Sequence, residues 1–114
     1  MSALELHGYE DRGCWVVRLQ DEVDHATVPY WKGILDLLNA GCYVAVDLHA
    51  VRYIDSAGIA LLVWLRRRTQ ETNGRLVLTR VPRFLERLLR IAGIPGLIPC
   101  YGDIATAVDS LAAA

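Results

Sequence analysis

Two short acidic stretches hold most of the side chains that could do chemistry. Asp24 and His25 lie in the first, and Asp55 and Ser56 lie in the second. These residue types could form a Ser-His-Asp hydrolase, but such a nucleophile typically sits in a Gly-x-Ser-x-Gly turn, and only the trailing glycine, Gly58, is present. Hydrolysis is therefore disfavoured, and His25 is expected to be an exposed loop histidine.

Ser56 lies where a strand should give way to a helix. A serine at that place can cap the helix, because its side-chain oxygen accepts from a backbone N–H one turn further on. A helix N-terminus also favours an anion, so an exposed Ser56 could carry a phosphate. Gly58 would then let the backbone of a partner approach closely. The residues alone favour the plain cap and leave the phosphate site open.

The chain around these residues predicts an α/β domain with a small mixed sheet, about four helices and a βαβ core. A turn at Asp11-Arg12-Gly13 and a polar loop over 21–27 separate the first elements. Strands are expected over 4–9, 14–19, 43–48, 75–79 and 97–100. Helices are expected over 28–39 with Thr27 as cap, over 57–72, from Pro82 to Gly93, and after the cap Asp103. One domain, 1–114, accounts for the whole sequence.

The helix opened by Pro82 has a distinct pattern of apolar and charged residues. The residues expected to face the core are Phe84, Leu85, Leu88, Leu89 and Ala92. Those expected to face water are Arg83, Glu86, Arg87 and Arg90. The arginines of this helix and the run Arg66-Arg67-Arg68 are expected to be solvated surface. The alternative for both is a docking patch for an acidic protein or for anionic lipid.

Composition narrows the class of protein. A hydrophobic content of 54% supports a packed core, and a net charge of −1 disfavours a dedicated nucleic-acid binder. No apolar run approaches the roughly 20 residues of a membrane-spanning helix, and the N-terminus does not resemble a secretory signal. Cys14, Cys42 and Cys100 are widely spaced, which indicates reduced, buried thiols. We expect a cytoplasmic protein without a metal site or cofactor.

The order of motifs along nearly the whole chain resembles the STAS family of bacterial anti-sigma factor antagonists. The strand 44–48 precedes Asp55-Ser56-Ala57-Gly58 at the family's spacing, and the stretch 19–24, followed by Thr27, is similar to the family's Leu-x-Gly-Glu-Leu-Asp. Asp21 stands where the family usually has glycine. If that position needs a positive φ angle, aspartate adopts it less easily than glycine does, which affects the loop that carries Asp24.

The resemblance implies a switch rather than an enzyme. The unphosphorylated chain would bind an anti-sigma factor that is also an ATP-dependent serine kinase and so release the sigma factor. Phosphorylation of Ser56 would end that binding, and a serine phosphatase would restore it. The resemblance places the partner-binding surface on Asp24, Thr27, Asp55, Ser56, Ala57 and Gly58.

The same family suggests an alternative function. STAS domains also serve as constitutive subunits of phospholipid-transport ABC ATPases, and this chain resembles those subunits in the apolar run 58–62. In that role the chain would clamp an ATPase without a phosphoserine. In either role we expect a monomer that neither contacts nucleic acid directly nor inserts into a membrane.

Overall fold

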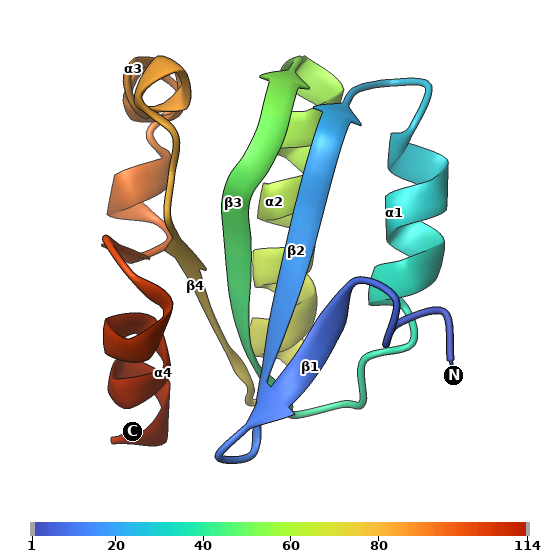
Figure 1. Ribbon diagram of the computed structural model, residues 1–114, viewed down its shortest axis with the longest axis vertical. Coiled ribbons are helices and arrows are strands. Elements are labelled where there is room, and N and C mark those ends of the chain that lie inside the picture. Colours follow the sequence, from blue (N-terminus) through green and yellow to red (C-terminus); the bar gives the residue numbers. More distant parts are fainter. Residues whose placement is uncertain (1, 114) are drawn as a thin grey trace.

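The computed structural model describes residues 2–113, which form one five-stranded sheet with helices on both faces (Figure 1). The strands lie in the order β1-β2-β3-β4-β5; β1 is antiparallel to β2, and the other neighbours are parallel. The elements along the chain are β1 (Gly8–Asp11), β2 (Cys14–Val23), α1 (Val28–Leu35), β3 (Tyr43–Ile54), α2 (Ser56–Glu71), β4 (Arg75–Thr79), α3 (Arg83–Ile91), a 3₁₀ turn (Ile94–Gly96), β5 (Cys100–Tyr101) and α4 (Ile104–Ala112).

This architecture confirms the predicted mixed sheet, the four helices and the βαβ core. The first hairpin turns at Arg12 and Gly13, whose φ angles of 52° and 79° suit a two-residue turn of the mirror-image type. The predicted strand over 4–9 is wrong in position, because pairing begins only at Gly8, opposite Val17. Residues 4–7 form turns instead.

The parallel pair β2–β3 is longer than its hydrophobic pattern indicates. The predicted loop over 21–27 is wrong for its first three residues, because β2 runs on to Val23, which pairs with Ile54. The register shifts between Arg18 and Gln20 and again between Asp21 and Glu22, and the φ angle of Asp21 is 58°. These irregularities break the alternation of apolar and polar residues, so the sequence pattern hides the end of the strand.

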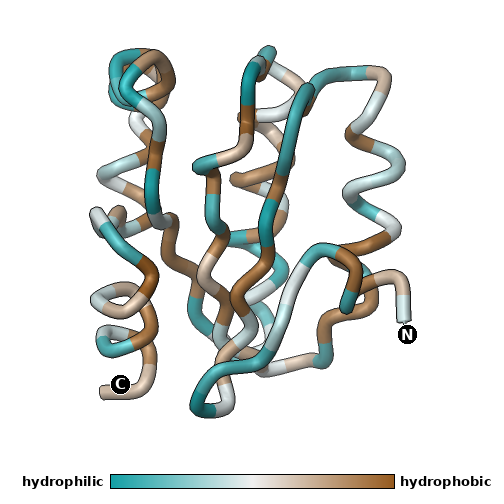
Figure 2. Tube along the Cα trace, in the orientation of Figure 1, coloured by the Kyte–Doolittle hydropathy of each residue, from teal (hydrophilic) through white to brown (hydrophobic). Residues whose placement is uncertain are grey.

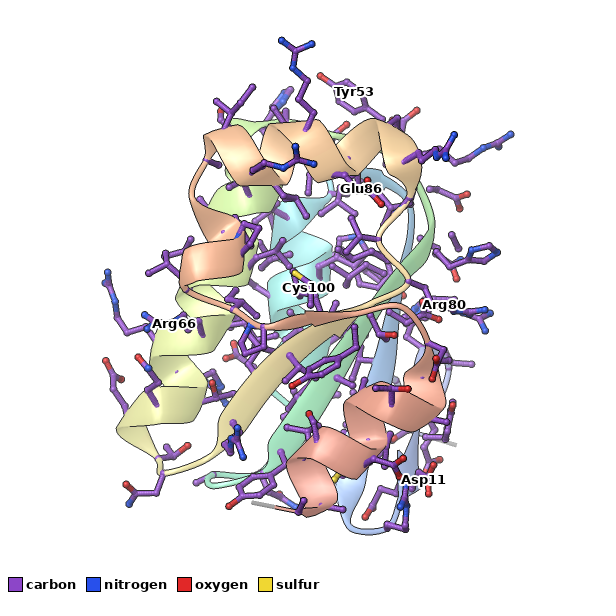
Figure 3. The ribbon with its side chains drawn as sticks, turned by 90° about the vertical axis from the view of Figure 1, so that its left-hand side faces the viewer. Asp11, Tyr53, Arg66, Arg80, Glu86 and Cys100 are labelled. Carbon is purple, nitrogen blue, oxygen red and sulfur yellow. The ribbon has the colours of Figure 1, made fainter. Side chains whose placement is uncertain are left out.

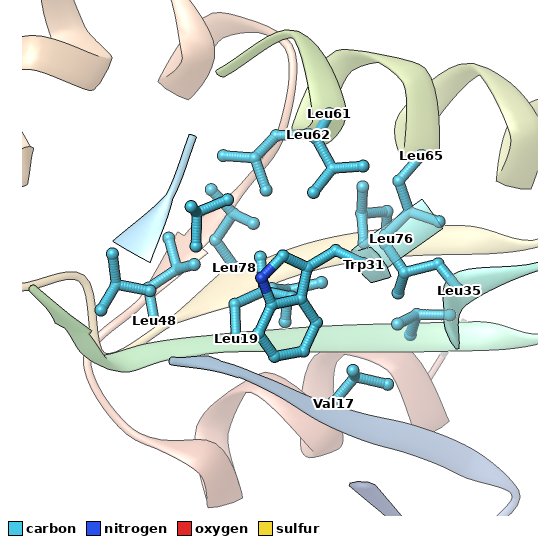
Figure 4. Packing of buried hydrophobic residues seen from close by; sticks show 14 of the residues in the cluster. Val17, Leu19, Trp31, Leu35, Leu48, Leu61, Leu62, Leu65, Leu76 and Leu78 are labelled. Atoms are coloured by element: carbon cyan, nitrogen blue, oxygen red, sulfur yellow. The ribbon is translucent and has the colours of Figure 1, made fainter. Parts of the chain in front are cut away.

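The larger core lies between the sheet and α1, α2 and α3, with Trp31 among its biggest side chains (Figure 4). The smaller core lies under α4 on the opposite face and includes Val16, Ala45 and Val108. The alternating residues of β3 contribute to both, which confirms that its centre is covered on both sides. Hydrophobic positions accordingly gather at the centre of the sheet, and hydrophilic ones gather at the upper ends of β2 and β3 (Figure 2).

Four other sequence expectations need correction. The helix predicted over 28–39 ends at Leu35, where hydrogen bonds from Leu37 N to Ile34 O and from Leu38 N to Leu35 O tighten the chain into a turn. The last strand is Cys100–Tyr101, later than predicted. Cys100 is exposed and Cys42 is half-buried, so of the three predicted buried thiols only Cys14 is buried. In α3, Leu85 and Leu89 face the core, but Phe84, Leu88 and Ala92 are exposed.

One carboxylate lies inside the sheet. Asp47 on β3 is 1% exposed, and its oxygens accept from Arg80 Nε at 3.1 Å and Nη2 at 2.7 Å. His49 N donates to the same carboxylate, and Arg18 Nε lies 3.9 Å away. The hydrogen bonds to Asp47, and then its charge, raise the pKa of Arg80. Asp47 is the buried charge among the apolar core residues of β3, and its bidentate pair with Arg80 neutralises that charge.

We predict that Arg80→Met lowers the free energy of unfolding by about 2 to 3 kcal/mol, because it leaves the Asp47 carboxylate buried without its main partner. The loss stays below that for a fully buried pair, since the Arg80 side chain is 33% exposed. Denaturant unfolding measures it. Arg75→Met, at an exposed position at the start of β4, the strand that Arg80 follows, is the control and should change little. Equal stability of Arg80→Met and wild type would contradict the role given to this pair.

A second prediction concerns Gly58 in the first turn of α2. A methyl group there would overlap Val23 O and Ile54 Cγ1, so Gly58→Ala should lower the free energy of unfolding by at least about 2 kcal/mol. Gly33 is also helical, and a methyl group there would meet nothing within 4 Å. Gly33→Ala should therefore stabilise the protein by up to about 1 kcal/mol. If both substitutions changed the free energy of unfolding by a similar amount, helix propensity rather than the close contact at Gly58 would explain the change.

Candidate functional site

The two acidic stretches meet at one end of the sheet because β2 and β3 are parallel and end together. Val23 pairs with Ile54, and Asp55 N donates to Val23 O at 3.4 Å. The residues that follow each strand, Asp24 and Asp55, therefore leave the sheet side by side. Tyr53, next to this end, points out from the top of the molecule (Figure 3).

Asp55 is the cap of α2. Its backbone is extended, with φ −111° and ψ −172°, and its Oδ1 accepts from Gly58 N at 3.0 Å. The other oxygen, Oδ2, accepts from His25 N at 3.1 Å, which ties the loop after β2 to the start of the helix. These hydrogen bonds, first of all that from Gly58 N, lower the pKa of Asp55. The expectation that Ser56 caps the helix is wrong, because Asp55 holds that position.

Ser56 is instead the first residue of α2, and it is exposed. Within residues 2–113, no hydrogen bond of its side chain is found, so neither the cap nor the core uses its hydroxyl. Its neighbour Ala57 is half-buried and Gly58 is buried. The need for a glycine at position 58 is internal, since the backbone of β2 and the side chain of Ile54 pack against it. The hydroxyl of Ser56 thus lies on a rigid corner and is open to solvent.

The loop after β2 is held by its own side chains. Asp24 Oδ1 accepts from Ala26 N and Thr27 N, each at 3.0 Å. Thr27 Oγ1 donates to Glu22 O at 2.8 Å and accepts from Asp24 N at 3.0 Å. Thr27 occupies the N-cap position of α1, but its side chain braces the loop instead of bonding to the helix. Asp24 and Thr27 therefore fix the conformation of the loop that lies beside Asp55.

Among the described residues, His25 is placed against Asp55 and not against the Ser56 hydroxyl. Its ring is 86% exposed, as expected of a loop histidine, and its Nδ1 lies 3.5 Å from Asp55 Oδ2. A relay needs a hydrogen bond between the serine hydroxyl and the imidazole. In the described part of the chain the hydrogen bonds of His25 join it to Asp55, and none joins it to Ser56.

Two arginines of the run 66–68 are used within the chain. Arg66 Nε donates to Leu97 O at 2.8 Å, and Arg68 donates to Asp36 Oδ1 at 2.8 Å and Asp36 O at 3.1 Å. Arg68 and Lys32 also lie over the ring of Trp64, 5.7 and 5.3 Å from its centroid. Arg66 and Arg68 therefore brace α2 against its neighbours, and these contacts argue against the docking patch considered for the run.

Sequence reasoning missed two features of this end of the molecule. One is the backbone of His25, whose N–H helps to fix Asp55; no pattern signals a hydrogen bond between residues this far apart in the chain. The other is the exposed apolar side of α3, because helical spacing shows that Phe84 and Leu88 share a face with Leu85 but not where burial stops.

Comparison with known proteins agrees with this architecture. The STAS domain model matches residues 7–107. The chain is 23% identical over 111 residues to the anti-sigma F factor antagonist of Paenibacillus polymyxa, covering 95% of each protein.

Solved structures resemble the fold at lower identity. An anti-sigma-factor antagonist (STAS) domain protein from Planctomyces limnophilus matches with a TM-score of 0.80 at 18% identity, over 93% of this chain and 97% of that one. The phosphorylated form of the Bacillus cell fate determinant SpoIIAA matches with a TM-score of 0.69 at 17% identity, over 91% and 96% of the two chains. Because the family model spans nearly all of the described strands and helices, the chain belongs to the STAS domain family.

Proposed function

We propose that this protein is an anti-sigma factor antagonist whose partner binding is switched off by phosphorylation of Ser56. The observation that carries the proposal is the placement of Ser56, an exposed hydroxyl on the first residue of a helix that another residue already caps. The name of the Paenibacillus relative and the phosphorylated state of the Bacillus structural relative support it. The chain acts as ligand and substrate of a kinase, and it supplies no catalytic group itself.

The corner can accept a phosphate without unfolding. The side chain of Ser56 points away from both cores, so the added group needs no room inside the protein. The N-terminus of α2 supplies a partial positive charge that favours an anion. Asp55 already uses Gly58 N, which limits the donors left for a phosphate. Because the phosphate needs no space in either core, the modified protein should stay folded.

The same corner explains how a phosphate would prevent binding. Phosphorylation adds about −1.5 to −2 charge at pH 7 beside Asp55, and Asp24 lies on the adjoining loop. A partner that packs closely over Ser56, or that presents carboxylates there, would meet both added bulk and repulsion. A penalty of about 3 kcal/mol weakens binding roughly a hundredfold. The proposed partner-binding surface is Asp24, Thr27, Asp55, Ser56, Ala57 and the backbone at Gly58.

The first test is intact-mass spectrometry of the protein incubated with its cognate ATP-dependent anti-sigma kinase. Wild type should gain one phosphate and Ser56→Ala none, because the nearby Thr27 hydroxyl is already bonded to Glu22 O and Asp24 N. A serine phosphatase should reverse the gain. Absence of phosphate on both proteins, together with a stable complex with a transport ATPase, would favour the constitutive-subunit alternative.

We predict further that Ser56→Asp binds the unphosphorylated protein's partner about a hundredfold more weakly than wild type, with an unchanged circular dichroism spectrum. Ala105→Asp is the matched control, because it adds a charge at an exposed position at the start of α4, which Asp103 caps in the same way. Isothermal titration with the anti-sigma factor measures both. Equal loss for the two variants would mean that charge anywhere on the chain disturbs binding.

The cap predicts a pH dependence of stability. The folded pKa of Asp55 lies below its ordinary value of 3.8, so its contribution is complete above that pH and is lost as pH falls through the lowered pKa. Asp55→Ala should be less stable than wild type at pH 6, and the gap should close in acid. Asp55→Asn keeps a capping oxygen without a charge, so it should retain much of the stability at pH 6. A gap between Asp55→Ala and wild type that is constant from pH 6 to strong acid would contradict this account. Thermal unfolding midpoints measure it.

A further inference from the structure

The exposed side of α3 carries a line of large apolar side chains. Phe84, Leu88 and Ile91 are 53%, 38% and 74% exposed, and their spacing of four and three residues places them in one row. Leu97, just after the 3₁₀ turn, is 43% exposed. Only Leu85 and Leu89 of this helix enter the core. We call Phe84, Leu88 and Ile91 the apolar row.

A row of arginines runs beside it on the same helix. Arg83, Arg87 and Arg90 repeat at the same spacing and are all exposed. In the part of the chain that the structure describes, neither an ion pair nor a side-chain hydrogen bond involves these three arginines, whereas Arg66, Arg68 and Arg80 are bonded within the chain. Glu86 is the helix's one acid. The helix therefore gathers positive charge on a chain whose net charge is −1.

The helix also lies at the outer limit of the molecule. Figure 1 shows it end-on at an upper corner, and Figure 3 shows it running across the top. The hollow of about 420 Å³ beside it is lined by Glu86, Leu89 and Arg90, on the flank away from the apolar row. The apolar row is thus a ridge, which a flat surface can reach along its whole length of roughly 10 Å.

We infer that α3 is a membrane-surface helix that binds bilayers containing anionic lipid, an activity that goes beyond the proposed switch at Ser56. The apolar row would enter the boundary between headgroups and acyl chains, and the arginines would contact the anionic headgroups. Antiparallel packing of a second copy against this face is disfavoured, because it would bring the two rows of arginines to the same side. An acidic protein would need a groove to receive the ridge, whereas a bilayer needs none. The short row predicts reversible binding that weakens with salt.

The test is co-sedimentation of the full chain with large vesicles of phosphatidylglycerol and phosphatidylcholine, beside vesicles of phosphatidylcholine alone. We expect binding to the anionic vesicles, at least about tenfold weaker binding to the neutral ones, and loss of binding in high salt. The double variants Phe84→Ser/Ile91→Ser and Arg83→Gln/Arg87→Gln should each weaken binding at least about tenfold. Both pairs replace exposed side chains, so circular dichroism should show an unchanged fold.

The controls use residues of the same types away from α3. Leu37→Ser removes a leucine that is 51% exposed, and Arg75→Gln removes an exposed arginine; both should bind vesicles like wild type. Failure of wild type to bind anionic vesicles would overturn the inference, as would equal binding by the α3 variants. If the α3 variants bind vesicles like wild type but no longer bind the anti-sigma factor, the surface binds that protein and the membrane inference is wrong. Phosphorylation of Ser56 is measured separately by mass and does not depend on any of these outcomes.

Discussion

The close approach of α2 to the ends of β2 and β3 is the constraint on which the rest of the site depends. At Gly58 the helix backbone lies so near Val23 O and Ile54 that a methyl group would overlap both. This contact lets Asp55 N reach Val23 O and lets the Asp55 side chain bond to both Gly58 N and His25 N. With a larger residue the helix would have to move away, and the loop after β2 would lose its link to the helix cap.

Because Asp55 caps α2, the side chain of Ser56 is not needed to stabilise the start of the helix. Asp55 supplies the oxygen that the helix start needs, so the hydroxyl of Ser56 is exposed on a backbone that is rigid on both sides. A phosphate added at such a position would change the surface charge without entering either core, which is the reason for proposing Ser56 as the site. A serine that served as the cap would lose its hydrogen bond on phosphorylation and would couple the modification to helix stability.

The molecule also separates its charges in space. The corner at the ends of β2 and β3 carries Asp24 and Asp55, whose oxygens are held by backbone N–H groups. The outer side of α3 carries arginines with exposed apolar neighbours. An ion pair between the buried Asp47 and the partly exposed Arg80 joins β3 to the residue after β4. The acidic corner at the ends of β2 and β3 and the basic outer side of α3 therefore attract groups of opposite charge.

Much of this protein follows from its sequence. The apolar run in β3, the Asp-Ser-Ala-Gly motif and the Asn73-Gly74 stop determine a strand, a helix and a second strand, because turn residues and periodicity act locally. Asp103 is likewise a cap in both sequence and structure. The order of motifs was enough to identify the STAS fold.

Tertiary structure alone decided the rest, because it depends on contacts between distant residues. Parallel pairing carried β2 on to Val23 through an irregular stretch in which Asp21 adopts a positive φ angle. The hydrogen bond from His25 N holds the second oxygen of Asp55, so the residue that caps α2 is also tied to the loop after β2. The packing of α3 against the sheet set which of its apolar residues are buried. Periodicity cannot decide this, since it gives the direction of a face and not the width that neighbours cover.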